Sequence, residues 1–88
     1  MAETRVVNKV RESFDVYIGR PSKWGNPFLI GKDGSREMVI KSYKQWVNHP
    51  EQVQLRADIK VELKGKRLGC YCKPKACHGD VLAEIADE

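Results

Sequence analysis

The sequence has only three cysteines and no long apolar run, and these two features exclude several classes of protein. Three cysteines in 88 residues is an odd number, which argues against the disulfide framework of a small secreted protein. No stretch approaches the roughly 20 apolar residues that cross a bilayer, and the N-terminal residues lack the apolar core of a secretion signal. We therefore expect a cytoplasmic protein with reduced thiols and no membrane partner.

Internal repeats, low-complexity tracts and linker-like segments are also absent. Hydrophobic residues make up 41 % of the chain and charged residues 32 %, which is ordinary for a globular protein. A chain of 88 residues is long enough for one domain with a thin core. We expect a single domain over residues 1–88.

The net charge of +4 is unevenly distributed. Residues 20–44 carry six basic and two acidic side chains, and residues 60–75 carry six basic and one acidic. Residues 76–88 carry four acidic side chains and no lysine or arginine. The two basic stretches predict attraction for anions, of which phosphate is the common biological one. They contain no interleaved aromatic repeat of the kind that tracks single-stranded nucleic acid.

The pattern of apolar residues predicts three short strands and three helices. The strands are expected at residues 5–10, 15–18 and 66–71. Ser35 can cap a helix that ends before His49 and Pro50, and a second helix over about 50–63 would present Val53, Ala57 and Val61 four residues apart. The last helix begins near His78, with a buried face formed by Val81, Leu82, Ile85 and Ala86.

Two helical segments between strands favour a parallel crossover, so we predict a small Rossmann-like α/β fold with a mostly parallel sheet and helices packed on it. Ligands of such sheets bind beyond the carboxyl ends of the strands. Residues 19–28 (GRPSKWGNPF) and 70–80 (CYCKPKACHGD) both follow predicted strands. We therefore expect the two segments to form one site.

The thiols and the imidazole of segment 70–80 allow three interpretations. In the first, Cys70, Cys72, Cys77 and His78 form a Cys₃His zinc site. The spacing is unusual for structural zinc, because one ligand pair is alternate and the other adjacent. Aiming both Cys77 and His78 at one ion is awkward at the start of a helix. Zinc is therefore possible, but no cofactor is favoured.

In the second interpretation, segment 70–80 binds an anion beside a reactive thiol. Backbone N–H groups at a helix start stabilise negative charge, and with two nearby lysines they would favour the thiolate of Cys72 or Cys77. His78 would act as general acid or base, and Asp80 would orient it. The spacing of Cys72 and His78 resembles the cysteine-x5-arginine loop of tyrosine phosphatases. Because imidazole cannot grip phosphate as arginine does, phosphatase activity is not predicted.

The third interpretation is structural: Cys70 packs in the core and Asp80 serves as a helix-start carboxylate. In segment 19–28, Arg20, Lys23 and Asn26 supply hydrogen-bond donors, and Trp24 and Phe28 supply rings for stacking. The structural alternative there is a loop whose aromatic residues anchor it to the core. We expect Arg20, Lys23, Trp24 and Asn26 to bind the ligand.

The stretches DVYIGRPSKWGNPF (15–28) and LKGKRLGCYCKPKACHGDVLAEIA (63–86) closely resemble a widespread family of small phage and bacterial proteins that is known only as a domain of unknown function. The family often has tryptophan where this chain has Tyr71. The resemblance implies that a motif is shared at Arg20, Lys23, Trp24, Asn26, Pro27, Cys70, Cys72, Cys77, His78 and Asp80, and it implies no reaction.

The leading hypothesis is therefore a binder of a phosphate-bearing small ligand, such as a nucleotide, with Cys72, Cys77, His78 and Asp80 as candidate catalytic residues. The alternative is a structural zinc module that acts as an interaction or nucleic-acid adaptor. Nucleic-acid binding through the basic stretches alone is a third possibility, and the acidic last helix counts against it.

Overall fold

The computed structural model describes residues 3–20, 22–71 and 75–88. Its sheet has three strands in the order β1-β3-β2, namely β1 (Arg5–Asn8), β3 (Arg67–Cys70) and β2 (Val16–Tyr17). Both outer strands run parallel to β3, and Val6 and Val16 both pair with Leu68. The parallel α/β fold predicted from the sequence is confirmed, although all three strands are shorter than expected.

The helices follow in the expected order: α1 (Arg36–Val47), a 3₁₀ turn η1 (Pro50–Gln52), α2 (Val53–Glu62) and α3 (Gly79–Ala86). The Ser35 hydroxyl accepts a hydrogen bond from the Met38 N–H, 3.3 Å away, which caps α1 as predicted. The apolar face predicted for α3 is confirmed, because its buried residues are Gly79, Val81, Leu82, Ile85 and Ala86.

The buried face of α2 is not the one formed by Val53, Ala57 and Val61, which the sequence pattern singled out. Val53 and Val61 are 63 % and 82 % exposed, whereas Ile59 is buried and Leu55 packs against the core. Val53 and Leu55 each begin a set of apolar residues spaced four apart along the helix. The set that contains the larger leucine and isoleucine side chains is buried, because these remove more apolar area from water.

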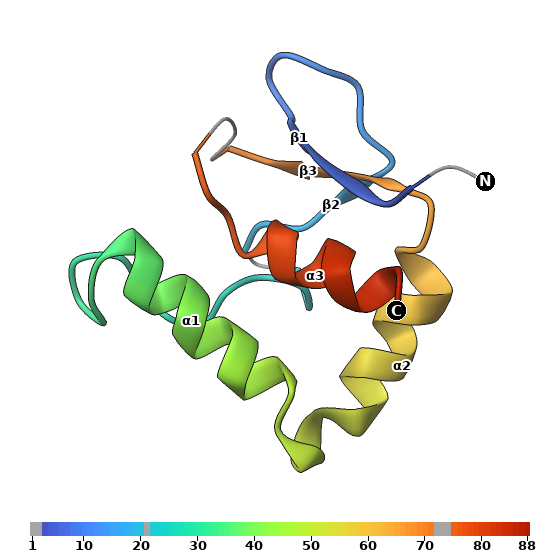
Figure 1. Cartoon of the computed structure of the whole chain (residues 1–88). Helices are drawn as coiled ribbons and strands as arrows, with labels where there is room; N and C mark the ends of the chain where they lie inside the picture. The colour runs from blue at the N-terminus through green and yellow to red at the C-terminus, as the bar shows by residue number, and fades with distance from the viewer. Residues whose placement is uncertain (1–2, 21, 72–74) are drawn as a thin grey trace.

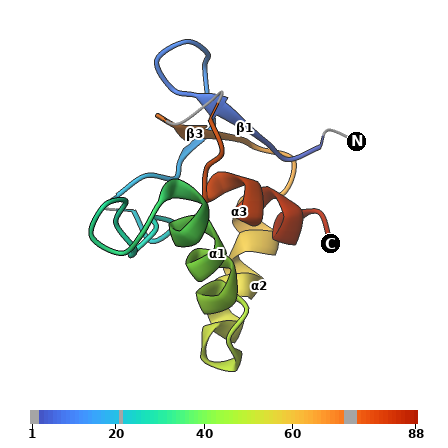
Figure 2. The ribbon, with the colours of Figure 1, turned by 60° about the vertical axis from the view of Figure 1, so that its left-hand side comes forward.

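The three helices lie on one side of the sheet (Figures 1 and 2). Helix α3 packs directly on β1 and β3, and α1 and α2 pack against α3. Gly79 lets α3 begin close to the sheet, since a Cβ there would lie 2.5 Å from Ile18 Cδ1. The core therefore lies between the sheet and the helices, with Ile18, Leu68 and Leu82 fully buried.

The opposite face of the sheet is crossed by the short connection between β1 and β2. Parallel strands ordinarily need a crossover of a dozen or more residues. Here residues 9–15 suffice, because the strands are short and the chain steps back only from the level of Cys70 to that of Leu68. The Phe14 ring covers Gly69, where a Cβ would lie 2.6 Å from Phe14 Cγ.

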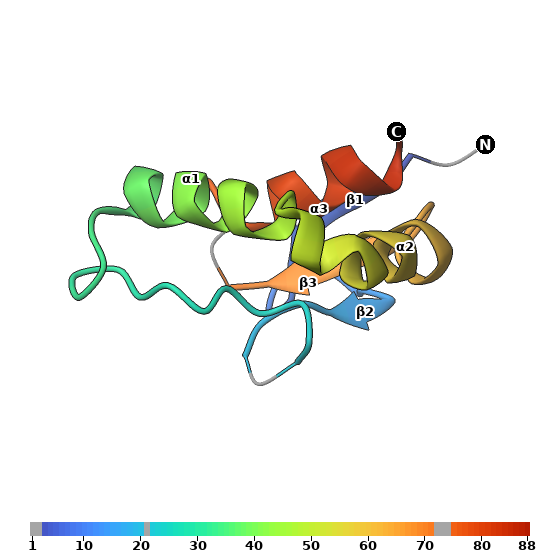
Figure 3. The same cartoon turned by 90° about the horizontal axis from the view of Figure 1, so that it is seen from below.

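The connection from β2 to α1 is long and runs beside α1 (Figure 3). It leaves the carboxyl end of β2, and the connection to α3 leaves the carboxyl end of β3, so both start at the same edge of the parallel sheet. In the described part of the chain, no helix is long and apolar enough to cross a membrane.

Candidate functional site

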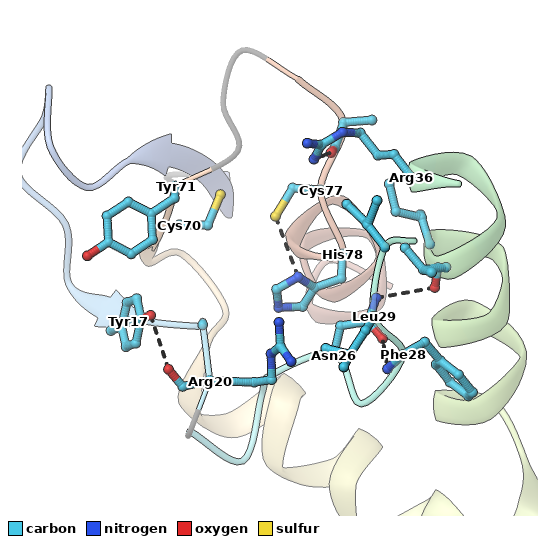
Figure 4. A pocket seen from close by; sticks show the side chains of 15 residues that line it. Tyr17, Arg20, Asn26, Phe28, Leu29, Arg36, Cys70, Tyr71, Cys77 and His78 are labelled. Atoms are coloured by element: carbon cyan, nitrogen blue, oxygen red, sulfur yellow. Dashed lines mark hydrogen bonds between the residues drawn. The ribbon is translucent and has the colours of Figure 1, made fainter. Parts of the chain in front are cut away.

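A cleft of about 640 Å³ opens at the carboxyl edge of the sheet (Figure 4). Segments 19–28 and 70–80 both line it, as the sequence predicted, and α1 closes its third side. The lining residues are Tyr17, Gly19, Arg20, Asn26, Phe28, Leu29, Ile30, Arg36, Val39, Ile40, Cys70, Tyr71, Ala76, Cys77 and His78.

Cys77 and His78 form a thiol–imidazole pair in this cleft. The distance between Cys77 Sγ and His78 Nδ1 is 3.6 Å, so the adjacent side chains turn toward one another. The Gly79 N–H at the start of α3 donates to the same sulfur, at 3.4 Å. A backbone N–H aimed at sulfur stabilises negative charge there.

The orientation of His78 is set by the backbone just after β2. His78 Nε2 lies 2.8 Å from the carbonyl oxygen of Ile18. Because a carbonyl only accepts, Nε2 carries the hydrogen and the lone pair of neutral His78 is on Nδ1, toward Cys77. The imidazole can therefore take the proton of the Cys77 thiol.

Burial lowers the pKa of His78 below its ordinary value, because desolvation penalises the charged ring. The carbonyls of Ile18 and Trp24 and the carboxylate of Asp80 oppose this shift, and the guanidinium of Arg20 adds to it. The net lowering of the pKa keeps the imidazole neutral near pH 7, in the form that accepts a proton.

Both described thiols are buried and reduced: Cys70 is 2 % exposed and Cys77 is 1 % exposed. Burial raises the pKa of Tyr43, and the negative charge that Cys77 carries when it is ionised adds to this shift. Cys72 lies outside the described residues. Within residues 3–20, 22–71 and 75–88, no three His, Cys, Asp or Glu side chains are grouped so that they could hold a metal ion.

Asp80 is placed as a helix-start residue. Its Oδ2 accepts a hydrogen bond from the Cys77 N–H, 3.2 Å away, and it is not among the residues that line the cleft. His78 precedes α3 without a side-chain cap, so Asp80 supplies the carboxylate in the first turn. This is the structural role that the sequence left open for Asp80, and the carboxylate still acts on His78 through its charge.

Two arginines face the cleft from different elements (Figure 4). Arg20, which was predicted, follows β2 and is exposed. Arg36 was not predicted; it lies in the first turn of α1, and its Nη1 donates to the Ala76 carbonyl at 3.1 Å. A positive charge in the first turn of a helix is unfavourable, because it opposes the helix dipole. The position of Arg36 was therefore a sequence signal that its guanidinium contacts another part of the fold.

Lys23 and Trp24 do not line the cleft. Trp24 is 4 % exposed and belongs to the main hydrophobic cluster, so its ring is not available for stacking on a ligand. The Tyr43 hydroxyl donates to the Trp24 carbonyl at 3.0 Å. Lys23 Nζ lies 4.6 Å from the centre of the Trp24 ring and 2.7 Å from Glu62 Oε2. In this structure both residues attach the loop to the core and to α2.

Asn26 lines the cleft while it organises the end of the loop. Its Oδ1 accepts from the Phe28 N–H at 2.9 Å, and its Nδ2 donates to the Val39 carbonyl at 3.2 Å. The side-chain amide thus joins segment 19–28 to α1. Asn26 is placed at the site, as predicted, with both polar atoms of the amide used by the protein.

Phe28, which the sequence offered for stacking or as an anchor, lines the cleft, and two further aromatic rings there come from residues that were not singled out. Tyr17 ends β2 and Tyr71 follows β3, and both line the cleft. Gly69 pairs with Tyr17, and Tyr71 is two residues beyond Gly69, so alternation predicts that both tyrosines point to one face of the sheet. The alternation along each strand is visible in the sequence. Only the observed pairing of β2 with β3 shows that the two tyrosines lie side by side.

The sequence of residues 3–88 matches the model of a family described as a domain of unknown function, DUF4326. An uncharacterized 12.4 kDa protein from the nrdA-td intergenic region of Enterobacteria phage T4 is 45 % identical over 85 residues, which cover 94 % of this chain and 77 % of that protein. The uncharacterized protein R718 of Acanthamoeba polyphaga mimivirus is 35 % identical over 96 residues, covering 89 % and 71 %. No solved structure matches the chain significantly.

Proposed function

The chain belongs to the DUF4326 family, and we propose that its function is to bind a phosphate-bearing small molecule, a nucleotide or nucleotide derivative, in the cleft between segments 19–28 and 70–80. One observation carries the proposal. The guanidinium groups of Arg20 and Arg36 come from separate elements to the same cleft, and no carboxylate lines it among the described residues. Such a cleft concentrates anions, and guanidinium groups pair with phosphate through two parallel hydrogen bonds.

The size and composition of the cleft agree with a small organic ligand. Its volume of about 640 Å³ lies within the roughly 300–1,000 Å³ of small-molecule sites. Apolar side chains such as Phe28, Leu29 and Ile40 make up much of the lining. A lining of this kind suits a ligand that has a flat ring with apolar faces and a charged end, as a nucleotide has.

The binding test is a calorimetric titration with adenosine 5′-monophosphate of the wild type and of Arg20→Ala and Arg36→Ala. A hydrogen bond to a charged group contributes about 1.5–3 kcal/mol, so each substitution should weaken binding by roughly 10- to 150-fold. Arg11→Ala is the charge-matched control, because Arg11 is exposed and does not line the cleft. Equal losses in all three variants, or no binding by the wild type, would contradict the proposal.

The Cys77–His78 pair is the proposed reactive centre of the same cleft. Its geometry is that of a nucleophile beside a base that a third group, here the Ile18 carbonyl, holds in place. Because Cys77 is almost fully covered, methyl methanethiosulfonate is a suitable probe of small size. Peptide mass spectrometry should find Cys77 modified more slowly in His78→Gln than in the wild type at pH 7.5. Equal rates would show that His78 does not activate the thiol.

A zinc module is the second candidate, favoured by one distance. Zinc binds sulfur at about 2.3 Å and nitrogen at about 2.0–2.1 Å, so two tetrahedral ligands of this kind lie about 3.5 Å apart. The 3.6 Å between Cys77 Sγ and His78 Nδ1 fits this separation, although the sequence made it awkward to aim these adjacent residues at one ion. Protein purified without a metal-binding tag should then contain one zinc per chain and unfold with chelators. Metal-free, folded protein would exclude this candidate.

A further inference from the structure

We propose that Tyr71 is the ring-binding residue of the cleft, against which the base of a bound nucleotide stacks. The inference rests on the proposed nucleotide function and adds to it where the base lies. The stacking role that was predicted for Trp24 is thereby assigned to the residue that directly follows β3.

The ring of Tyr71 is exposed at the cleft, unlike that of Trp24. The Tyr71 side chain lines the cleft and is 63 % exposed, whereas Trp24 is 4 % exposed. An aromatic ring that remains in water at the edge of a cleft has apolar area left to cover, and a flat ligand ring would cover it. Base–aromatic stacking tolerates any base, since every base has a flat π-face.

The Tyr71 ring is already held in position by two neighbouring side chains. Tyr17 meets it edge to face, with ring centres 6.5 Å apart and planes at 80°. Lys9 Nζ lies 4.7 Å from the centre of the Tyr71 ring and 4.4 Å from that of Tyr17. Lys9 itself is not among the residues that line the cleft. Because these contacts already hold the Tyr71 ring in place, it can bind a planar ring at little cost in side-chain entropy.

Tyr17 links the Tyr71 ring to Arg20, the arginine proposed to bind phosphate. The Tyr17 hydroxyl donates to the Arg20 carbonyl at 3.2 Å, so the tyrosine that supports Tyr71 also positions the backbone of Arg20. Gly19 makes the approach possible, because a Cβ there would overlap the Tyr17 hydroxyl. One connected unit thus presents a ring and a guanidinium group to the same cleft (Figure 4).

Two probes separate the ring from the phosphate: adenosine 5′-monophosphate carries both, and ribose 5-phosphate carries only the phosphate and sugar. Stacking on one aromatic side chain should make Tyr71→Ala bind adenosine 5′-monophosphate roughly 5- to 150-fold more weakly. The same variant should bind ribose 5-phosphate like the wild type. Tyr71→Phe, which keeps the ring, should bind both probes like the wild type.

The outcomes distinguish this inference from the proposed function. If Tyr71→Ala keeps its affinity for adenosine 5′-monophosphate, or the wild type binds both probes equally well, the ring-binding role is wrong and phosphate binding stands. If the wild type binds neither probe, both proposals fail. Because Tyr71 is exposed, unfolding midpoints of the variants should match that of the wild type, and a matched midpoint validates each comparison.

Discussion

Arg20 and Trp24 are four residues apart in one loop, but the structure uses them differently. Arg20 is exposed and faces the cleft, whereas Trp24 is 4 % exposed in the core cluster. Lys23 goes with Trp24, since its ammonium pairs with Glu62 on α2. The ends of the loop therefore form the site, and its middle anchors it. Both kinds of residue belong to one motif, so a shared motif does not imply a shared role.

Trp24→Ala should have the largest effect on stability, because Trp24 anchors the loop in the core. Removing a buried indole should cost about 3–5 kcal/mol of unfolding free energy, a large fraction of the stability of a small domain. Urea unfolding followed by circular dichroism measures the loss, and Trp24→Phe should recover part of it. Arg20→Ala should stay within about 0.5 kcal/mol of the wild type. A fully stable Trp24→Ala protein that has lost its nucleotide affinity would reverse the two roles.

His78 lines the cleft and also packs against the buried Tyr43, so its titration should affect the stability of the fold. Its pKa is lowered in the folded protein, mainly by burial, which means that the unfolded chain takes up the proton first as the pH falls. The stabilisation is fully present above the ordinary histidine pKa of about 6.5 and is lost as the pH drops below it.

The urea midpoint of the wild type should therefore fall more steeply between pH 7.5 and 5 than that of His78→Gln. The slopes are compared rather than the absolute midpoints, because the substitution also changes packing against Tyr43, whose ring centre lies 5.1 Å from that of His78. Parallel slopes would mean that His78 titrates alike in both states.

The smallest expected effect is that of Lys23→Ala. The Lys23 ammonium and the Glu62 carboxylate are both about half exposed, so water and salt screen their attraction. We expect a slight lowering of the urea midpoint that disappears in 0.5 M sodium chloride, and unchanged affinity for adenosine 5′-monophosphate. A marked loss of affinity would place Lys23 at the site after all.

Local patterns predicted most of the fold. The Ser35 cap and the apolar face of α3 depend on residues within one or two turns, so the sequence contains them directly. In α2 two apolar stripes competed, and side-chain volume together with the position of α3 decided which one was buried. The parallel sheet followed from the order of the elements.

The site was predictable only in part, because its residues meet through tertiary contacts. The grouping of Arg20, Asn26, Cys77 and His78 followed from their places after parallel strands. The sequence left open whether Trp24 anchors the loop or stacks on a ligand, since an aromatic residue in a loop rich in glycine and proline can face either way. Arg36 reaches the cleft from α1, and its contribution depends on how α1 lies beside segment 70–80.

Segments 19–28 and 70–80 are proposed to form one binding site. Amide ¹H–¹⁵N spectra recorded during a titration with adenosine 5′-monophosphate test it directly. The signals of Gly19, Arg20 and Asn26 should move with the same apparent affinity as those of Cys77 and Gly79, while those of α2 stay in place. Shifts confined to one segment, or different affinities for the two, would contradict a single shared site.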